Sequence, residues 1–150
     1  MKDIKKLVFY IFITIIIGSL PALFIKFSDT YNYLNKPPLA PSGIVFPIVW
    51  TILFILMGIS IYRVSLKDDD VNLKIIYFSN LLINALWTPL FFGLNLYLFS
   101  FLWIIILLIV TFIMFYKFYI VDKISGYLLI PYIIWLLFAG YLNLFIYLLN

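Results

Sequence analysis

Two asparagines four residues apart are the polar side chains best placed for chemistry in this sequence. Asn80, Asn84, Trp87 and Phe91 recur at helical spacing within residues 75–116, a stretch that contains no charged residue. An amide group in hydrocarbon is costly unless it is hydrogen-bonded, so both asparagines should face the interior of a helix bundle or a cavity. We expect Asn80 mainly to join helices, whereas Asn84, beside Trp87, is the better candidate for binding a ligand.

Two further aromatic faces can complete such a site. They consist of Phe46, Trp50 and Phe54, and of Tyr132, Trp135, Ala139 and Asn143. Ala139 and Gly140 remove bulk beside Trp135, which permits either close helix contact or access by a flat ligand. The sequence therefore predicts that three tryptophans and Asn84 converge on one cavity. The fourth tryptophan, Trp103, has no polar neighbours in the sequence and is expected to pack or to face lipid.

The residue types that are missing exclude several chemistries. The chain has no His and no Cys, and its six acidic residues are all Asp. These absences exclude a thiolate nucleophile, a Ser-His-Asp triad and the usual zinc sites, and they remove the usual axial ligands of haem. No carboxylate lies within an expected membrane span, so conventional acid–base catalysis also lacks its groups. We expect no metal site and no required cofactor.

The helices that must position these residues follow from composition. Of the 150 residues, 67% are hydrophobic and 11% are charged, with a mean hydropathy of +1.20. A chain this short cannot bury so much apolar surface in one core, so lipid must be its main solvent. Uncharged stretches of about 20 residues predict an all-α integral membrane protein, a bundle of five transmembrane helices. The expected spans cover residues 7–25, 44–62, 75–93, 95–117 and 124–149, in a single domain of residues 1–150.

Breakers and charges define the connections. A tight hairpin is expected at Gly93–Asn95, and the first apolar run is too long for a signal peptide, so it is expected to remain as a span. Basic residues indicate a cytoplasmic N-terminus, because one side of the membrane carries most of them. That side holds Lys2, Lys5, Lys6, Arg63, Lys67, Lys74, Lys117 and Lys123, and the other holds Lys26 and Lys36. No basic patch suited to nucleic acid is expected.

The connection over residues 27–43 is longer than two helices require. Pro37, Pro38 and Pro41 stiffen it, and Tyr31 and Tyr33 give it aromatic surface. Two interpretations remain open: a rigid strap with interfacial tyrosines, or a lid over a cavity between the helices.

Together these motifs resemble those of the TspO/MBR family, the translocator protein or peripheral benzodiazepine receptor family, and indicate a bacterial member. The resemblance rests on Tyr31-x-x-Leu34-x-Lys36-Pro37, Pro41, Phe46-Pro47-x-Val49-Trp50-x-x-Leu53, Met57-Gly58, the run from Asn84 to Gly93 (NALWTPLFFG), and Pro131-Tyr132-x-x-Trp135-x-x-Phe138-Ala139-x-x-Leu142-Asn143. It covers nearly the whole chain.

The resemblance implies a five-helix bundle, usually a homodimer, with a pocket beneath the first long loop. It implies tetrapyrrole ligands such as protoporphyrin IX and haem, together with benzodiazepine-type drugs. Trp50 and Asn84 would donate N–H groups to a ligand carbonyl or carboxylate, and Trp87 and Trp135 would flank the ring. The remaining implied contacts are Tyr31, Pro41, Phe46, Phe138 and Ala139.

Three positions depart from the family pattern in the loop: Thr30 and Leu39 stand where Trp is usual, and Ser42 stands where proline is. The loop is therefore less aromatic than usual. The sterol motif of animal members needs Lys or Arg after Tyr147, and only Leu148, Leu149 and Asn150 follow, so sterol recognition is not predicted.

A flat aromatic ligand would be held by stacking, shape and hydrogen bonds, without iron ligation. The resemblance also implies light- and oxygen-dependent breakdown of protoporphyrin, for which Trp50 and Trp135 are the candidate photochemical residues. Two other functions stay open. A porphyrin transporter would move the ligand, although the spans hold no charged relay, and a ligand-responsive sensor or scaffold would pass the bound state to a partner.

Overall fold

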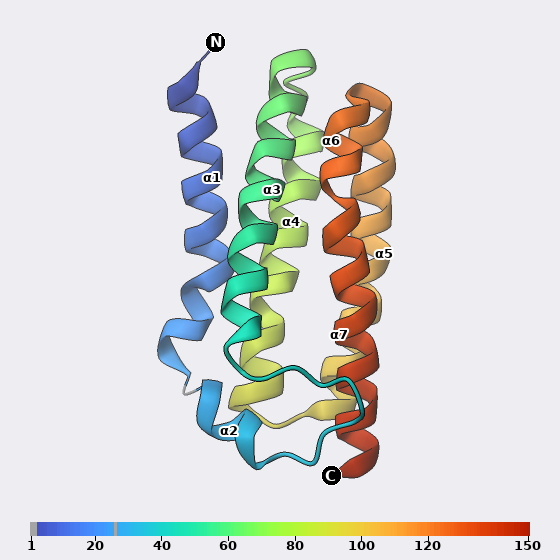
Figure 1. The fold of residues 1–150 in the computed structure, drawn as a ribbon. Helices are drawn as coiled ribbons and strands as arrows, with labels where there is room; N and C mark the ends of the chain where they lie inside the picture. Colours follow the sequence, from blue (N-terminus) through green and yellow to red (C-terminus); the bar gives the residue numbers. More distant parts are fainter. Residues whose placement is uncertain (1–2, 26) are drawn as a thin grey trace.

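The computed structural model describes residues 3–25 and 27–150, and within them the chain is a bundle of long helices (Figure 1). The elements are α1 (Ile4–Ser19), η1 (Leu20–Phe24), α2 (Phe27–Tyr33), α3 (Val45–Lys67), α4 (Val71–Thr88), η2 (Pro89–Gly93), α5 (Tyr97–Val121), α6 (Lys123–Leu128) and α7 (Ile130–Leu149). Within these described residues, five helical segments are long and apolar enough to cross a membrane. The expected all-α, five-helix membrane fold is confirmed.

The helices extend beyond the uncharged stretches at the end of the bundle that holds the N-terminus. Helix α3 continues to Lys67 and helix α4 begins at Val71, so the turn between them is shorter than the sequence suggested. Long basic side chains reach toward water from a helix end, which lets the helix extend past its apolar part. Asp70 caps α4, because its carboxylate accepts a hydrogen bond from the Asn72 amide at 2.9 Å.

Close helix contacts hold this end together. A Cβ built on Gly58 of α3 would lie 2.6 Å from the Cα of Ile11 in α1, and one on Gly126 of α6 would lie 2.7 Å from the Cβ of Tyr119 in α5. Such distances are below van der Waals contact, so only glycine permits these approaches. The backbones therefore pack directly against one another here.

A buried carboxylate joins three elements at the same end. Asp122 accepts hydrogen bonds from Arg63 at 2.8 Å and Lys67 at 2.5 Å, and it caps α6 through the amide of Ser125 at 3.0 Å. Burial raises the pKa of Asp122, but the hydrogen bonds from Arg63, Lys67 and Ser125 outweigh it and hold that pKa well below its usual range. Asp122 is therefore an ionised anchor between α3 and α6.

The opposite end of the bundle is irregular (Figure 1). The first span continues beyond Ser19 as the 3₁₀ turn η1, with Pro21 in its first turn, and α4 continues into the π-helical turn η2. The hairpin expected at Gly93–Asn95 is present, with Asn95 at φ 54°. The 27–43 connection differs from an open loop, because its first part forms the short helix α2.

Residues 34–44, here called the strap, connect α2 to α3 across this end. The side chain of Asn150 accepts a hydrogen bond from the Asn35 amide at 3.0 Å and donates one to the Asn35 carbonyl at 2.9 Å. Tyr141 of α7 donates to the carbonyl of Pro38 at 2.8 Å. The strap is thus tied to the end of α7.

Candidate functional site

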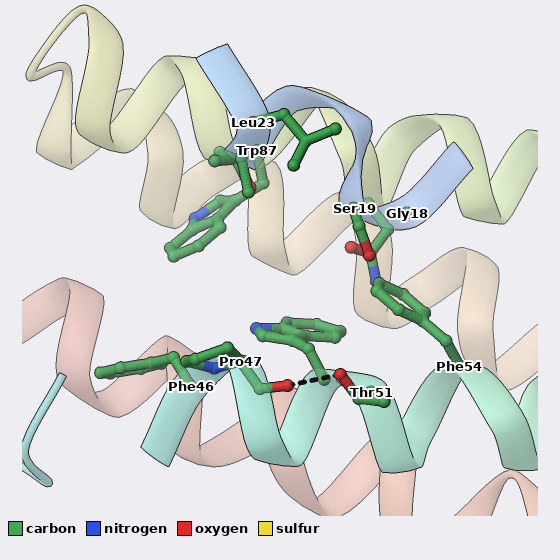
Figure 2. Close-up of a pocket in the computed structure, with 12 residues that line it drawn as sticks. Gly18, Ser19, Leu23, Phe46, Pro47, Thr51, Phe54 and Trp87 are labelled. Atoms are coloured by element: carbon green, nitrogen blue, oxygen red, sulfur yellow. Dashed lines mark hydrogen bonds between the residues drawn. The ribbon is translucent and has the colours of Figure 1, made fainter. Parts of the chain in front are cut away.

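A cavity of about 340 Å³ lies between the first span, α3 and α4 (Figure 2). Its lining residues are Gly18, Ser19, Ala22, Leu23, Phe46, Pro47, Trp50, Thr51, Phe54, Asn84, Trp87 and Thr88. In Figure 2, Trp87 and Leu23 lie on one side of this space, and Phe46, Pro47 and Thr51 lie on the other. The cavity therefore separates the aromatic face of α3 from the end of α4.

Stacked aromatic pairs stiffen both walls. The ring of Trp50 stacks on Phe54 at 5.5 Å, and the ring of Trp87 stacks on Phe91 at 5.1 Å, measured between centroids. Both tryptophans are half-buried, so each keeps part of its surface free. Flat apolar walls of this kind suit a flat aromatic ligand.

Small residues in the first span leave the space open. Gly18, Ser19 and Ala22 lie around the start of η1, where Pro21 ends the regular helix. A Cβ on Gly18 would meet the ring of Phe54 at 2.3 Å, so a glycine is required where the first span passes this ring. The sequence interpretation missed this wall. The signal that could have found it was the small pair Gly18-Ser19, one residue before Pro21 and opposite an aromatic face.

The two asparagines face the bundle interior, as expected, with exposed fractions of 0% for Asn80 and 5% for Asn84. Asn84 donates from Nδ2 to the hydroxyl of Tyr132 at 2.8 Å, and Tyr132 donates to Oδ1 of Asn80 at 2.9 Å. Asn80 in turn donates to Thr111 of α5 at 2.7 Å. Asn80 therefore joins helices, while Asn84 belongs both to this chain of hydrogen bonds and to the cavity wall.

Two indole N–H groups donate to neighbouring helices. Trp87 donates to Oδ1 of Asn143 at 3.0 Å, and Asn143 donates to the carbonyl of Tyr97 at 2.7 Å. Trp103, which is half-buried, donates to the carbonyl of Ile83 at 2.8 Å, a partner that its apolar neighbours in the sequence do not indicate. The carbonyl of Ile83 lies within α4, and no sequence pattern shows which tryptophan will reach such an acceptor.

The structure brings the rings of Trp50 and Trp135 together, but only Trp50 and Trp87 line the cavity. Trp135 meets Trp50 edge to face at 6.4 Å and Phe46 at 5.8 Å, so the rings do gather. However, Trp135 and Ala139 are not among the residues that line the cavity; with Trp50, Asn84 and Trp87 they surround a space of about 10 Å³. The N–H of Trp135 is buried and has no hydrogen-bond partner among the described residues.

Three further candidate residues lie outside the cavity. Tyr31 is buried, meets Phe46 edge to face at 5.0 Å, and donates to the carbonyl of Pro41 at 2.7 Å. Tyr31 and Pro41 thus hold the strap against α3. Phe138 lines an open groove of about 530 Å³ between α3 and α7, together with Trp135. Of the nine candidate ligand contacts, the cavity is lined by Phe46, Trp50, Asn84 and Trp87.

The cavity offers apolar surface and a few neutral polar groups. Among the described residues, no Asp, Lys or Arg lines it, and no group of three acidic, His or Cys side chains forms a metal site. Its polar side chains are those of Ser19, Thr51, Asn84, Thr88 and the two indoles, and Thr51 already donates to the carbonyl of Pro47 at 2.7 Å. The arrangement suits binding by shape, stacking and hydrogen bonds.

Comparisons with known proteins agree with this architecture. The TspO/MBR family matches residues 9–149 of the chain. The chain is 38% identical to the "Tryptophan-rich protein TspO" of Chlorobaculum tepidum over 124 residues, which cover 80% of this chain and 78% of that protein. It is 36% identical to "Protein CrtK" of Rhodobacter capsulatus with the same coverage. It is also 37% identical to the "Tryptophan-rich protein TspO" of Archaeoglobus fulgidus over 99% of each chain. The chain is an integral membrane protein that belongs to the TspO/MBR family.

Proposed function

We propose that this protein binds a flat aromatic ligand, a tetrapyrrole such as protoporphyrin IX or haem or a benzodiazepine-type compound, in the cavity between the first span, α3 and α4. The observation that carries the proposal is the pair of tryptophan walls, Trp50 and Trp87, with the amide of Asn84 on the lining of the same cavity. An apolar pocket with a few placed polar groups is the usual form of a small-molecule site.

The volume of the cavity separates the ligand classes. At about 340 Å³ it lies near the lower end of the range of small-molecule pockets, about 300–1,000 Å³. A compact bicyclic ring fits within such a space. A tetrapyrrole is larger, so its binding requires the rim formed by Ala22 and Leu23 to give way. This rim belongs to the 3₁₀ turn η1, whose hydrogen bonds are weaker than those of an α-helix.

The test is the quenching of tryptophan fluorescence by protoporphyrin IX in the purified protein. Ala22→Phe fills the cavity and leaves all four tryptophans in place, and we expect it to weaken binding at least tenfold. Leu20→Phe, in the same 3₁₀ turn but not on the cavity lining, is the matched control and should bind as the unaltered protein does. Equal affinity in all three proteins would place the ligand elsewhere.

A light-dependent reaction is the second part of the proposal. Trp50 lines the cavity and contacts Trp135, which places a second indole directly behind the first. We propose that illuminated, bound protoporphyrin is oxidised by oxygen, with these two indoles supplying or quenching reactive intermediates. Trp50→Phe and Trp135→Phe should each lose most of the light-dependent decay of porphyrin absorbance, with no change in the dark, whereas Trp103→Phe should keep it. Undiminished decay in both former variants would contradict the assignment.

The charges support a cytoplasmic N-terminus. Among the described residues, Lys5, Lys6, Arg63, Lys67, Lys74, Lys117 and Lys123 lie toward the end that holds the N-terminus, and Lys36 lies at the other; Lys2 and Lys26 fall outside the described residues. We propose the orientation that this asymmetry favours. The chain has no cysteine, so single Cys variants can be labelled selectively. A membrane-impermeant thiol reagent should label Leu39→Cys in intact cells, and Asp68→Cys only after lysis.

A further inference from the structure

The exposed residues on the lining of the cavity belong to η1 and α3. They are Ala22 and Leu23 of η1, and Pro47 and Thr51 of α3, whereas the lining residues of α4 are buried or half-buried. In Figure 2, Leu23 lies across the open space from Pro47 and Thr51. The cavity therefore opens between η1 and α3, and this opening, bounded by the four exposed residues, is here called the window.

The window exists because the first span turns away from α3. The two helices touch at Gly18, where an added Cβ would collide with the ring of Phe54. Regular α-helix ends at Ser19, shortly before Pro21, and η1 then packs against α4. Farther on, Ile25 reaches η2, since a Cβ built on Gly93 would lie 3.7 Å from its Cδ1. A gap between the first span and α3 is left on the strap side of Gly18.

The window lies within the membrane-spanning part of the molecule. The residues that bound it belong to the spans Ile4–Phe24 and Val45–Lys67. At a rise of 1.5 Å per residue, Thr51 lies about 9 Å along α3 from Val45, and Phe54 lies about 14 Å from it. One leaflet contributes about 15 Å of hydrocarbon, so the window occupies the leaflet at the strap end. It therefore faces acyl chains rather than water.

The edges of the window are suited to contact with hydrocarbon. Ala22 and Leu23 have apolar side chains, and Pro47 has no backbone N–H. The hydroxyl of Thr51 donates to the carbonyl of Pro47 at 2.7 Å, which satisfies the side-chain donor of this edge within α3. A polar group is costly in lipid unless it is paired, and here an aromatic ring can pass without breaking a side-chain hydrogen bond.

The cavity is closed toward water at the strap end. Phe46, on the cavity lining, meets the ring of Tyr31 edge to face at 5.0 Å. Tyr31 is buried and donates to the carbonyl of Pro41 at 2.7 Å. Among the described residues, those of the strap are not on the lining. A ligand that came from water would have to move both rings and break this hydrogen bond, whereas the window is already open.

We propose that the window is the entrance of the site and that the ligand arrives from the bilayer, passing sideways between η1 and α3 while the strap stays in place. This inference rests on the proposed function, because it concerns the same cavity. It narrows the ligand class to flat aromatic compounds whose ring dissolves among acyl chains. It also assigns to Leu23 and Thr51, on opposite sides of the window, control over the rates at which the ligand enters and leaves.

The experiment closes the window reversibly in protein that is already folded in liposomes. The chain has no cysteine, so Leu23→Cys/Thr51→Cys can be bridged specifically with a bismaleimide whose spacer contains a disulfide. Association and dissociation of protoporphyrin IX are followed by the quenching of tryptophan fluorescence, and mass spectrometry counts the bridges. We expect the bridge to slow both rates at least tenfold relative to the same variant before bridging. Cleavage of the spacer by a reductant should restore them.

A second variant obstructs the window without a bridge. Leu23→Cys alone, modified with a bulky aromatic maleimide, should also slow association, and the same variant modified with N-methylmaleimide should not. Equal association rates for the two modified proteins would contradict the proposed entrance.

The matched control is Asn35→Cys/Asn150→Cys, bridged with the same reagent. These two side chains are hydrogen-bonding neighbours at 2.9 Å, so the bridge fixes the strap to the end of α7. Both rates should stay unchanged. Slowing by the strap bridge, or unchanged rates with the window bridge in place, would overturn the inference while leaving ligand binding intact. No saturable binding of protoporphyrin IX to the unaltered protein would instead overturn the proposed function.

Discussion

The two ends of the bundle are built in different ways. At the end that holds the N-terminus, α3 and α5 are regular, Gly58 and Gly126 let backbones touch, and Asp122 bridges α3 and α6. At the strap end, the first span loses α-helical geometry at η1, and α4 gives way to the π turn η2. The cavity lies at the strap end, between these interrupted segments.

The difference shows where this fold places stability and where it places a site. Regular helices with small residues at their contacts pack without space for a ligand. A 3₁₀ or π turn changes the direction of the side chains that follow it, so neighbouring helices no longer interlock, and room remains between their rings. Substitutions at the end that holds the N-terminus should therefore change the free energy of unfolding, and substitutions at the strap end should change ligand affinity.

The largest effect on unfolding is expected from Gly58→Ala. The added Cβ would lie 2.6 Å from the Cα of Ile11, a backbone atom that moves only if α1 moves. Overpacking of this kind lowers the free energy of unfolding by about 1–3 kcal/mol. The measurement is the thermal unfolding midpoint in detergent.

The matched control for this prediction is Gly140→Ala on α7. Its added Cβ would lie 3.6 Å from the Cγ2 of Ile104, an ordinary contact, and alanine favours the helix. Its midpoint should equal or exceed that of the unaltered protein. Equal midpoints for the two alanine variants would mean that α1 does not press on α3 as the structure shows.

An intermediate effect is expected from Asp122→Asn, which keeps a capping side chain but removes the charge that Arg63 and Lys67 share. Both cations remain partly exposed to water, so the loss should be about 1–2 kcal/mol rather than that of a fully buried pair. The pKa of Asp122 is lowered in the folded protein, so its contribution is present above the unfolded pKa and is lost as pH falls. The unaltered protein should lose stability below about pH 4.

The same pH series provides the control. Asp122→Asn should be less stable at neutral pH but should show a smaller decline in acid, so the two stability curves approach each other. Parallel curves would indicate that another carboxylate causes the acid sensitivity.

The smallest effect on unfolding is expected from Asn150→Ala. This change removes both side-chain hydrogen bonds to Asn35, which are exposed and together contribute about 0.5–1 kcal/mol. Hydrogen exchange should accelerate at the amides of the strap and stay unchanged in the middle of α3, where Met57 and Ile61 are fully buried. Exchange that accelerates equally in both regions would contradict the separation of the two ends.

The sequence was sufficient to predict where the helices lie and which faces of some of them point into the bundle. Uncharged runs predicted the five spans, and the cost of an amide in lipid predicted that Asn80 and Asn84 point inward. Gly93 and Asn95 predicted the hairpin, because both tolerate the turn conformation that the structure shows at Asn95.

The lining of the cavity and the contacts between distant residues depend on how the helices rotate against one another, and the periodicity of the sequence does not determine that rotation. A helical face predicts that Trp135 is turned inward, but not that the ring of Trp50 stands between it and the cavity. The wall from Gly18 to Leu23 was missed because small residues look alike at a tight contact and beside a space. The basic partners of Asp122 are 55 and 59 residues away in the chain, and no local pattern connects them to it.

Because of the π turn after Thr88, the number of residues in this segment determines which side chains form the wall of the cavity. In η2 the amide of Leu94 bonds the carbonyl of Pro89, five residues earlier, at 2.9 Å. Such a turn accommodates one residue more than an α-turn. Deleting a single residue from it would rotate Trp87 relative to Tyr97 by about 100°, the angle between successive residues of a helix. A homologue one residue shorter in this segment must therefore form this wall from other side chains, even if every aromatic residue is retained.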